Sequence, residues 1–146
     1  MTELHKLSIK EKLKGLKDST FSSQELTESY LKRIKKLDNK INSFITVLED
    51  TAVKSAKESD QRYISGSALP LDGIPIAHKD IFCTEGVLTS CGSRMLSNFI
   101  SPYSSTVVKN FEESGSVVLG KTNMDEFAMG SSNETSYFGE VKNPWK

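Results

Sequence analysis

A lysine follows an apolar stretch near the middle of the chain, in the run Gly73-Ile-Pro-Ile-Ala-His-Lys79-Asp80. The stretch is typical of a strand, and Pro75 places it at a strand start or at a sheet edge. A lysine at the end of a buried strand loses hydration, which lowers the pKa of its amine and makes it a general base. The alternative is a structural lysine that pairs with Asp80 or extends to solvent. Composition alone favours this alternative.

Two neighbours of Lys79 have simpler interpretations. Side chains alternate along a strand, so His78 is expected to point away from Lys79 and to serve as a structural histidine. Asp80 either orients a neighbouring loop or pairs with a cation, and the sequence leaves both interpretations open.

The run from Gly120 to Trp145 combines glycines, hydroxyls, amides and aromatic rings. This mixture is typical of the wall of a small-molecule pocket. Within it, Gly130-Ser131-Ser132 is expected to form an exposed loop whose N–H and O–H groups can bind a carboxylate or an oxyanion. The alternative is an ordinary serine-rich turn.

A short helix is expected to lead into this loop. Thr122 and Asp125 are residue types that favour a helix start. Met124, Phe127 and Ala128 would pack inward from it. The chain would then leave the helix through the exposed loop.

The segment Gly115–Thr122, GSVVLGKT, fits the phosphate-binding loop pattern letter for letter. In a true phosphate loop, a strand precedes the first glycine and the intervening backbone N–H groups form a cradle. Here a helical stretch ending at Ser114 precedes the first glycine, and Ser116–Leu119 is expected to be a strand itself. We therefore reject a nucleotide-binding loop.

Length, charge and cysteine content exclude further classes of function. The 146 residues suit one domain, and 19 basic residues balance 19 acidic ones, so no basic surface for nucleic acid is indicated. Cys83 and Cys91 fit neither a disulfide framework nor a zinc site, and free thiols are expected. The beginning of the chain lacks the apolar run of a signal peptide, and a cytoplasmic location is expected.

Helix and strand signals alternate along the chain and predict an α/β fold. Capping boxes at Ser8–Glu11 and Ser22–Glu25 mark two helix starts. The later helices are expected over residues 23–39, 51–63 and 104–114, and the strands over 44–48, 74–77 and 116–119. The strand–helix–strand order over 74–119 is typical of a right-handed unit with parallel strands. A loop at 65–68 divides a helical part, 1–64, from an α/β part, 71–146.

Together, these pieces resemble the amidase signature family. The runs that carry the resemblance are Leu71–Asp80, Thr106–Lys109, Gly115–Asn123, Met124–Glu134, Phe138-Gly139 and Asn143–Trp145. Within the family, they are most similar to the branch that serves tRNA-dependent amidotransferases. The resemblance covers nearly the whole chain. It implies an α/β fold with N-terminal helices followed by part of a mixed β-sheet flanked by helices, in a single incomplete domain over residues 1–146.

The resemblance gives Lys79 a catalytic role. The family uses a triad of two serines and a lysine, in which the neutral lysine amine accepts a proton through the middle serine and activates the nucleophile. Gly130 and Ser131 are substrate-binding candidates, and no metal ligand is expected. Both family serines lie in a downstream Gly/Ser-rich segment that residues 1–146 do not contain. The chain alone is therefore predicted to be inactive.

The resemblance also implies partners, namely amidotransferase subunits B and C. The larger of the two, B, is expected to bind tRNA and to use ATP with Mg²⁺, and C is expected to be small. Glutamine would be the substrate, tRNA would be reached through the complex, and no cofactor is expected in this chain. Two alternatives stay open. One is a non-catalytic interaction module whose helical N-terminus binds a partner, and the other is part of a general amidase with another substrate.

Overall fold

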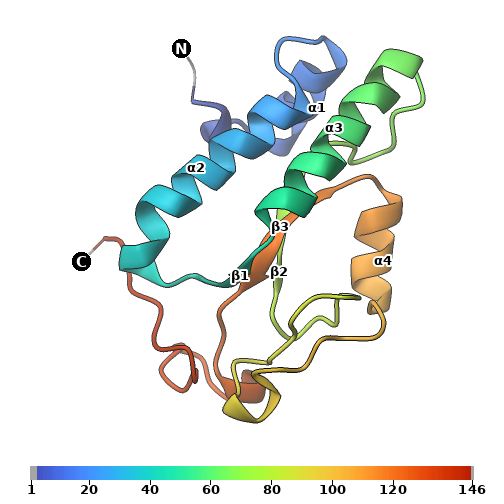
Figure 1. Cartoon of the computed structure of the whole chain (residues 1–146). Helices are drawn as coiled ribbons and strands as arrows, with labels where there is room; N and C mark the ends of the chain where they lie inside the picture. Colours follow the sequence, from blue (N-terminus) through green and yellow to red (C-terminus); the bar gives the residue numbers. More distant parts are fainter. Residues whose placement is uncertain (1–2, 146) are drawn as a thin grey trace. The chain divides into compact units, whose positions relative to one another are not determined.

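The structure is a computed structural model that describes residues 3–145. These residues form helices α1 (Ile9–Lys17), α2 (Ser23–Ile41), α3 (Glu49–Ser65) and α4 (Thr106–Glu113), strands β1 (Phe44–Val47), β2 (Pro75–Lys79) and β3 (Val117–Thr122), and 3₁₀ turns at Leu4–Lys6, Arg94–Leu96 and Glu126–Ala128 (Figure 1). Residues 1, 2 and 146, which the expected domain bounds include, lie outside the described part.

The three strands form one mixed sheet in the order β1-β3-β2. β1 runs antiparallel to β3, with Thr46 opposite Lys121. The Val117 N–H donates to the Ile74 carbonyl at 2.9 Å and the Asp80 N–H to the Thr122 carbonyl at 3.0 Å, so β2 runs parallel to β3. The α/β prediction is therefore confirmed. The handedness of the β2–α4–β3 connection stays a prediction.

Both expected capping boxes are present at the helix starts. At α1, the Glu11 N–H donates to Ser8 Oγ and the Ser8 N–H donates to Glu11 Oε2. At α2, Ser22 and Glu25 make the same exchange, at 2.8 and 3.0 Å. Each exchange satisfies backbone donors that the first helical turn leaves unpaired, so short polar motifs fix where both helices begin.

The chain divides into two compact units, each built from three separated segments. Unit 1 contains the described residues up to Ile34, Leu48–Ile76 and Asn110–Leu119. Unit 2 contains Lys35–Val47, Ala77–Lys109 and the described residues from Gly120 onward. The expected division into a helical part, 1–64, and an α/β part, 71–146, stays a prediction.

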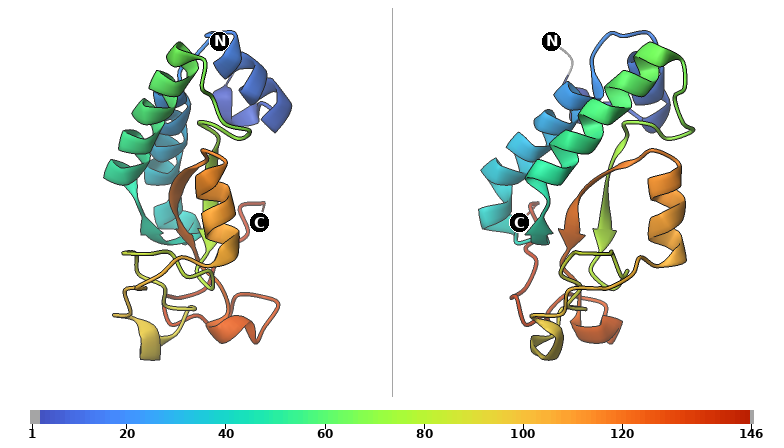
Figure 2. Two further views of the ribbon diagram at one scale, coloured as in Figure 1. Left: turned by 90° about the vertical axis from the view of Figure 1, so that its right-hand side faces the viewer. Right: turned by 45° about the vertical axis from the view of Figure 1, so that its right-hand side comes forward.

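Unit 1 has two apolar clusters. In the first, Leu31 of α2 packs with Ala52 and Ala56 of α3 and with Val117 and Leu119 of β3. The two alanines leave room for α3 to approach closely, and α2 and α3 lie side by side in both views of Figure 2. In the second, buried side chains from α1, from α2 and from the residue before β2 meet, namely Leu16, Leu26 and Ile74.

Hydrogen bonds join separate loops within unit 2. The Phe127 N–H donates to the Cys91 carbonyl at 2.9 Å, and the Tyr137 N–H donates to the Gly92 carbonyl at 2.8 Å. A Cβ on Gly92 would lie 2.5 Å from the Met124 carbonyl oxygen, and its φ is +67°, so the close approach needs glycine. These bonds place the loop after β2 against the loop after β3, which is where the candidate site lies.

Candidate active site

Lys79 is the last residue of β2, and its side chain is exposed. Within residues 3–145 the Lys79 side chain is not desolvated, because alternation along β2 turns His78 inward and Lys79 outward. Lys79 does not pair with Asp80 either, since that carboxylate faces Lys121. Within the described residues Lys79 therefore extends away from the buried interior, and its catalytic role stays a prediction.

Lys79 lines a cavity of about 480 Å³ within unit 2, together with the segments 123–125, 130–133 and 141–144. The structure therefore brings Lys79 to the same cavity as Gly130 and Ser131. Gly130 and Ser131 are exposed, and among residues 3–145 nothing accepts a hydrogen bond from their backbone N–H groups. Free N–H donors beside an amine suit a ligand that carries a carboxylate or develops an oxyanion.

The loop after β3 differs from the sequence-based expectation. No α-helix forms between residues 122 and 132, and Phe127 and Ala128 are exposed with φ of 51° and 59°, whereas Met124 is buried as expected. The expected helix is wrong because Asp125 organises the segment differently. Its carboxylate accepts the backbone N–H groups of residues 132, 133 and 135, so the chain folds back around the carboxylate.

Asp125 thus acts as the centre of the Gly130–Ser131 loop. The Thr135 hydroxyl adds a fourth hydrogen bond, at 2.9 Å, to the same carboxylate. The backbone donors at Asn133 and Thr135 lower the pKa of Asp125 below its ordinary value of 3.8, so the carboxylate is charged at neutral pH. The charged carboxylate of Asp125 therefore orders the loop that contains Gly130 and Ser131.

Behind Lys79, Asp80 and Lys121 form a fully buried ion pair. Lys121 Nζ lies 3.3 Å from Asp80 Oδ1 and donates to the Phe82 carbonyl at 2.8 Å and to Thr89 Oγ1 at 3.1 Å. Asp80 Oδ2 accepts the N–H and the hydroxyl of Ser90. Both open interpretations of Asp80 therefore hold, since it pairs with a cation and orients a loop.

Burial changes the titration of the groups around this ion pair. Desolvation lowers the pKa of Lys121, and the charge of Asp80 opposes that effect. Desolvation and then the charge of Lys121 lower the pKa of His78, which is buried. The buried amine that the sequence suggested at Lys79 is therefore found at Lys121.

The sequence pointed to Lys121 only through the phosphate-loop pattern. The rejection of that pattern is confirmed, because α4 precedes Gly115 and the strand continues through Lys121 to Thr122. A usable signal was present, since Val117, Leu119 and Lys121 alternate onto one face and all three are buried. Because the strand was expected to end at Leu119, the alternation was not extended to Lys121.

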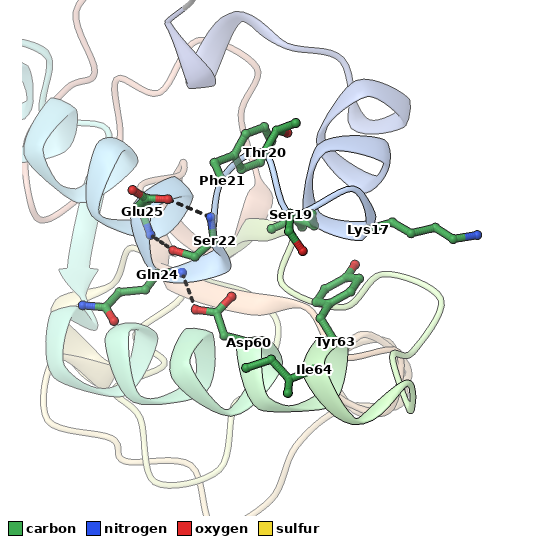
Figure 3. A pocket seen from close by; sticks show the side chains of 11 residues that line it. Lys17, Ser19, Thr20, Phe21, Ser22, Gln24, Glu25, Asp60, Tyr63 and Ile64 are labelled. Carbon is green, nitrogen blue, oxygen red and sulfur yellow. Dashed lines mark hydrogen bonds between the residues drawn. The ribbon is translucent and has the colours of Figure 1, made fainter.

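A second cavity, of about 460 Å³, lies in unit 1 around the start of α2. Figure 3 shows the carboxylates of Asp60 and Glu25 directed at backbone N–H groups there. The Ser22 hydroxyl accepts the Glu25 N–H. These polar groups are occupied in capping α2, so this cavity offers less for catalysis than the one beside Lys79.

A metal site needs a cluster of ligand side chains, and a membrane span needs a long apolar helix. Within residues 3–145, no group of three or more His, Cys, Asp or Glu side chains is placed to hold a metal ion. In the same part of the chain, no helix combines the length and the apolar character that crossing a membrane requires.

Comparison with known proteins decides the family. The sequence profile of the Amidase family matches residues 25–146. The chain belongs to the amidase family. It is 59% identical over 145 residues to the A subunit of the Glutamyl-tRNA(Gln) amidotransferase of Psychrobacter cryohalolentis, a match that covers 99% of this chain and 29% of that protein. The chain thus spans under a third of the length of this curated relative.

Solved structures agree with the family. The A subunit of the Glutamyl-tRNA(Gln) amidotransferase of Thermotoga maritima is similar with a TM-score of 0.79 and 38% identity, over 99% of this chain and 29% of that one. The peptide amidase of Stenotrophomonas maltophilia is similar with a TM-score of 0.88 and 31% identity, over 97% of this chain and 30% of that one. The mixed sheet and its helices therefore match part of the amidase fold.

Proposed function

We propose that this chain supplies part of the glutamine-hydrolysing site of a tRNA-dependent amidotransferase, which converts Glu-tRNA(Gln) to Gln-tRNA(Gln). The observation that carries the proposal is the 59% identity, over 99% of the chain, to the A subunit of a Glutamyl-tRNA(Gln) amidotransferase. The shared cavity of Lys79, Gly130 and Ser131 supports it, because it combines an amine with free N–H donors.

In this proposal Lys79 is the base of the serine–serine–lysine triad. Its neutral amine takes a proton through the middle serine, and the activated serine attacks the side-chain amide carbon of glutamine. An acyl-enzyme forms and ammonia leaves. Gly130 and Ser131 bind the substrate through their backbone N–H groups. Both serines are expected outside residues 1–146, so the chain alone is proposed to lack activity.

The proposal includes the partners that a complete enzyme needs. Subunits B and C would join this chain, glutamine would be the substrate, and tRNA would be reached through the complex. ATP and Mg²⁺ would be used by the larger partner, B, and this chain would need no cofactor of its own. A role in charging tRNA fits a cytoplasmic location.

A general amidase is the second candidate. The higher TM-score to the peptide amidase, 0.88 against 0.79, favours it. The sequence favours the amidotransferase, with 38% identity to the Thermotoga maritima protein and 31% to the peptide amidase. We give the sequence more weight, because one fold serves many substrates and the side chains of the site select among them.

A chimera tests the proposed function. Residues 1–146 would replace the matching segment of the Psychrobacter cryohalolentis relative, and ammonia release from glutamine would be measured beside that of the 146-residue chain alone. The proposal predicts release by the chimera, in complex with subunits B and C, and none by the chain alone. Turnover of glutamine by the isolated chain would contradict it, and so would a folded chimera that hydrolyses only peptide amides.

A further inference from the structure

The backbone on the C-terminal side of Lys79 is fixed at several points. The Asp80 N–H donates to the Thr122 carbonyl at 3.0 Å, and the Asp80 carbonyl accepts the Cys91 N–H at 3.2 Å. The Phe82 N–H donates to the Lys79 carbonyl at 3.0 Å and closes a tight turn. The direction in which Lys79 leaves β2 therefore depends on this turn.

Lys121 binds the same turn from inside unit 2. Its ammonium donates to the Phe82 carbonyl at 2.8 Å and lies 3.3 Å from Asp80 Oδ1. It thus contacts two of the three residues that follow Lys79. Neither Lys121 nor Asp80 reaches solvent.

A buried ion pair at this position is not required for the stability of unit 2. Replacing a buried ion pair by apolar residues of similar volume is often neutral or stabilising, whereas removing one partner is strongly destabilising. Asp80 uses its other oxygen to accept the N–H and hydroxyl of Ser90, at 2.8 and 2.5 Å. The pair therefore ties three separate segments together at the residue next to Lys79.

We propose that Lys121 is a positioning residue for Lys79, acting through Asp80 and the Phe82 carbonyl. Its ammonium holds the turn after β2 in one conformation, and that conformation directs the Lys79 side chain into the cavity lined by Gly130 and Ser131. The functional importance of this positioning by Lys121 rests on the proposed role of Lys79 as a base.

The test reads the conformation of Lys79 without any turnover. The chain would be labelled with ¹³C in its lysines, and the Cα and Cβ signals of Lys79, assigned with a Lys79→Arg variant, would report its backbone conformation. Two variants are compared with the wild type, Lys121→Met and the double variant Asp80→Asn/Lys121→Met. Urea unfolding of each gives its stability, and the Lys10 signals serve as an internal control because Lys10 is exposed on α1.

The two variants separate positioning from stability. Lys121→Met leaves the buried Asp80 carboxylate without a partner, so the urea midpoint of this variant should fall. The double variant should regain the wild-type midpoint, because no unpaired charge remains in it. If Lys121 positions Lys79, the ¹³C signals of Lys79 should shift toward those of an unstructured lysine in both variants, while the ¹³C signals of Lys10 should not change. Unchanged Lys79 signals in the folded double variant would overturn the proposal.

A milder variant decides the case if both of these unfold. Ser90→Ala removes the hydroxyl that donates to Asp80 Oδ2 and accepts the Gly92 N–H at 3.2 Å, while the Ser90 N–H keeps its bond to Asp80. A partial shift of the Lys79 signals in the same direction is then expected, and no shift would overturn the proposal. Because the signals are read without glutamine, this result is independent of whether the chimera hydrolyses glutamine.

Discussion

The carboxylate of Asp125 occupies the space that a side chain at Gly130 would need. A Cβ on Gly130 would lie 2.5 Å from Asp125 Cγ and 2.7 Å from Oδ2. The same carboxylate accepts N–H groups from the residues that follow Gly130, at Ser132, Asn133 and Thr135. The loop that lines the cavity beside Lys79 is therefore wrapped around one charged group, and glycine at position 130 allows the wrapping.

Gly130→Ala is expected to displace this loop. The added methyl group collides with Asp125, and overpacking of this kind costs about 1–3 kcal/mol of unfolding free energy. Amide signals of Ser132, Asn133 and Thr135 should shift in the NMR spectrum. Gly86→Ala is the control for the three amides: a Cβ there meets nothing within 4 Å, so it adds backbone strain at φ of +73° without a collision. Equal effects of the two variants on the three amides would contradict this account.

Asp125→Ala should release the same loop without a collision. Removing the carboxylate leaves the N–H groups of Ser132, Asn133 and Thr135 without their acceptor, so their hydrogen exchange should accelerate by about tenfold or more. Amides in α1 and α2 should keep their protection. Exchange that stays slow at all three amides in the variant would show that other contacts order the loop.

Lowering the pH should have the same effect as that substitution. The folded-state pKa of Asp125 is lowered, so its hydrogen bonds stabilise the loop above the ordinary carboxyl pKa and are lost as pH falls through the folded value, below 3.8. Hydrogen exchange at Ser132, Asn133 and Thr135, corrected for its intrinsic pH dependence, should rise in that range in the wild type. The Asp125→Ala variant should show no such rise.

Asp72→Asn is expected to destabilise unit 1 by about 2 kcal/mol at neutral pH. Arg62 donates two hydrogen bonds of 2.8 Å to the buried Asp72 carboxylate. Losing one member of a buried pair costs about 3–5 kcal/mol, and the value is lower here because the Arg62 side chain is 32% exposed. Asp18→Asn, which breaks an exposed pair with Lys14, should leave the urea midpoint almost unchanged.

The cost of Asp72→Asn should depend on pH. Desolvation acts to raise the pKa of Asp72, but the bonds from Arg62 and the Leu69 N–H outweigh it and leave the pKa below 3.8. Stability from Asp72 is therefore present above that ordinary value and is lost as pH falls through the folded value. The difference between wild type and variant, measured by urea unfolding, should shrink below about pH 4. A constant difference down to about pH 2 would contradict the ion-pair explanation.

The elements with local signals were predictable from the sequence. The serines and glutamates of the two capping boxes are three residues apart and marked the starts of α1 and α2. The helices expected over residues 23–39 and 51–63 are present as α2 and α3, and Gly115, directly after the helix expected over residues 104–114, has a left-handed φ of +84°. These features depend on neighbours within one or two helical turns, which a sequence displays directly.

The candidate site was predictable only in part. Lys79, Gly130 and Ser131 were individually suspected, but only the structure shows that β2 and the later loop bring them to one cavity. The helix expected after Thr122 was wrong, because hydrogen bonds to Asp125 from up to ten residues away outweighed local helix propensity. The burial of Lys121 depended on Asp80 and Phe82, about forty residues earlier, and no local pattern reveals that pairing.

The most direct test of the account is the activity of Lys79 variants in the chimera that carries residues 1–146. General-base catalysis contributes about 10²–10⁴-fold, so Lys79→Met should lower kcat for ammonia release from glutamine by at least about 10² while KM changes little. Lys54→Met, at an exposed lysine on α3, should retain wild-type activity. A folded Lys79→Met chimera that keeps its kcat would contradict the central claim that Lys79 is the base.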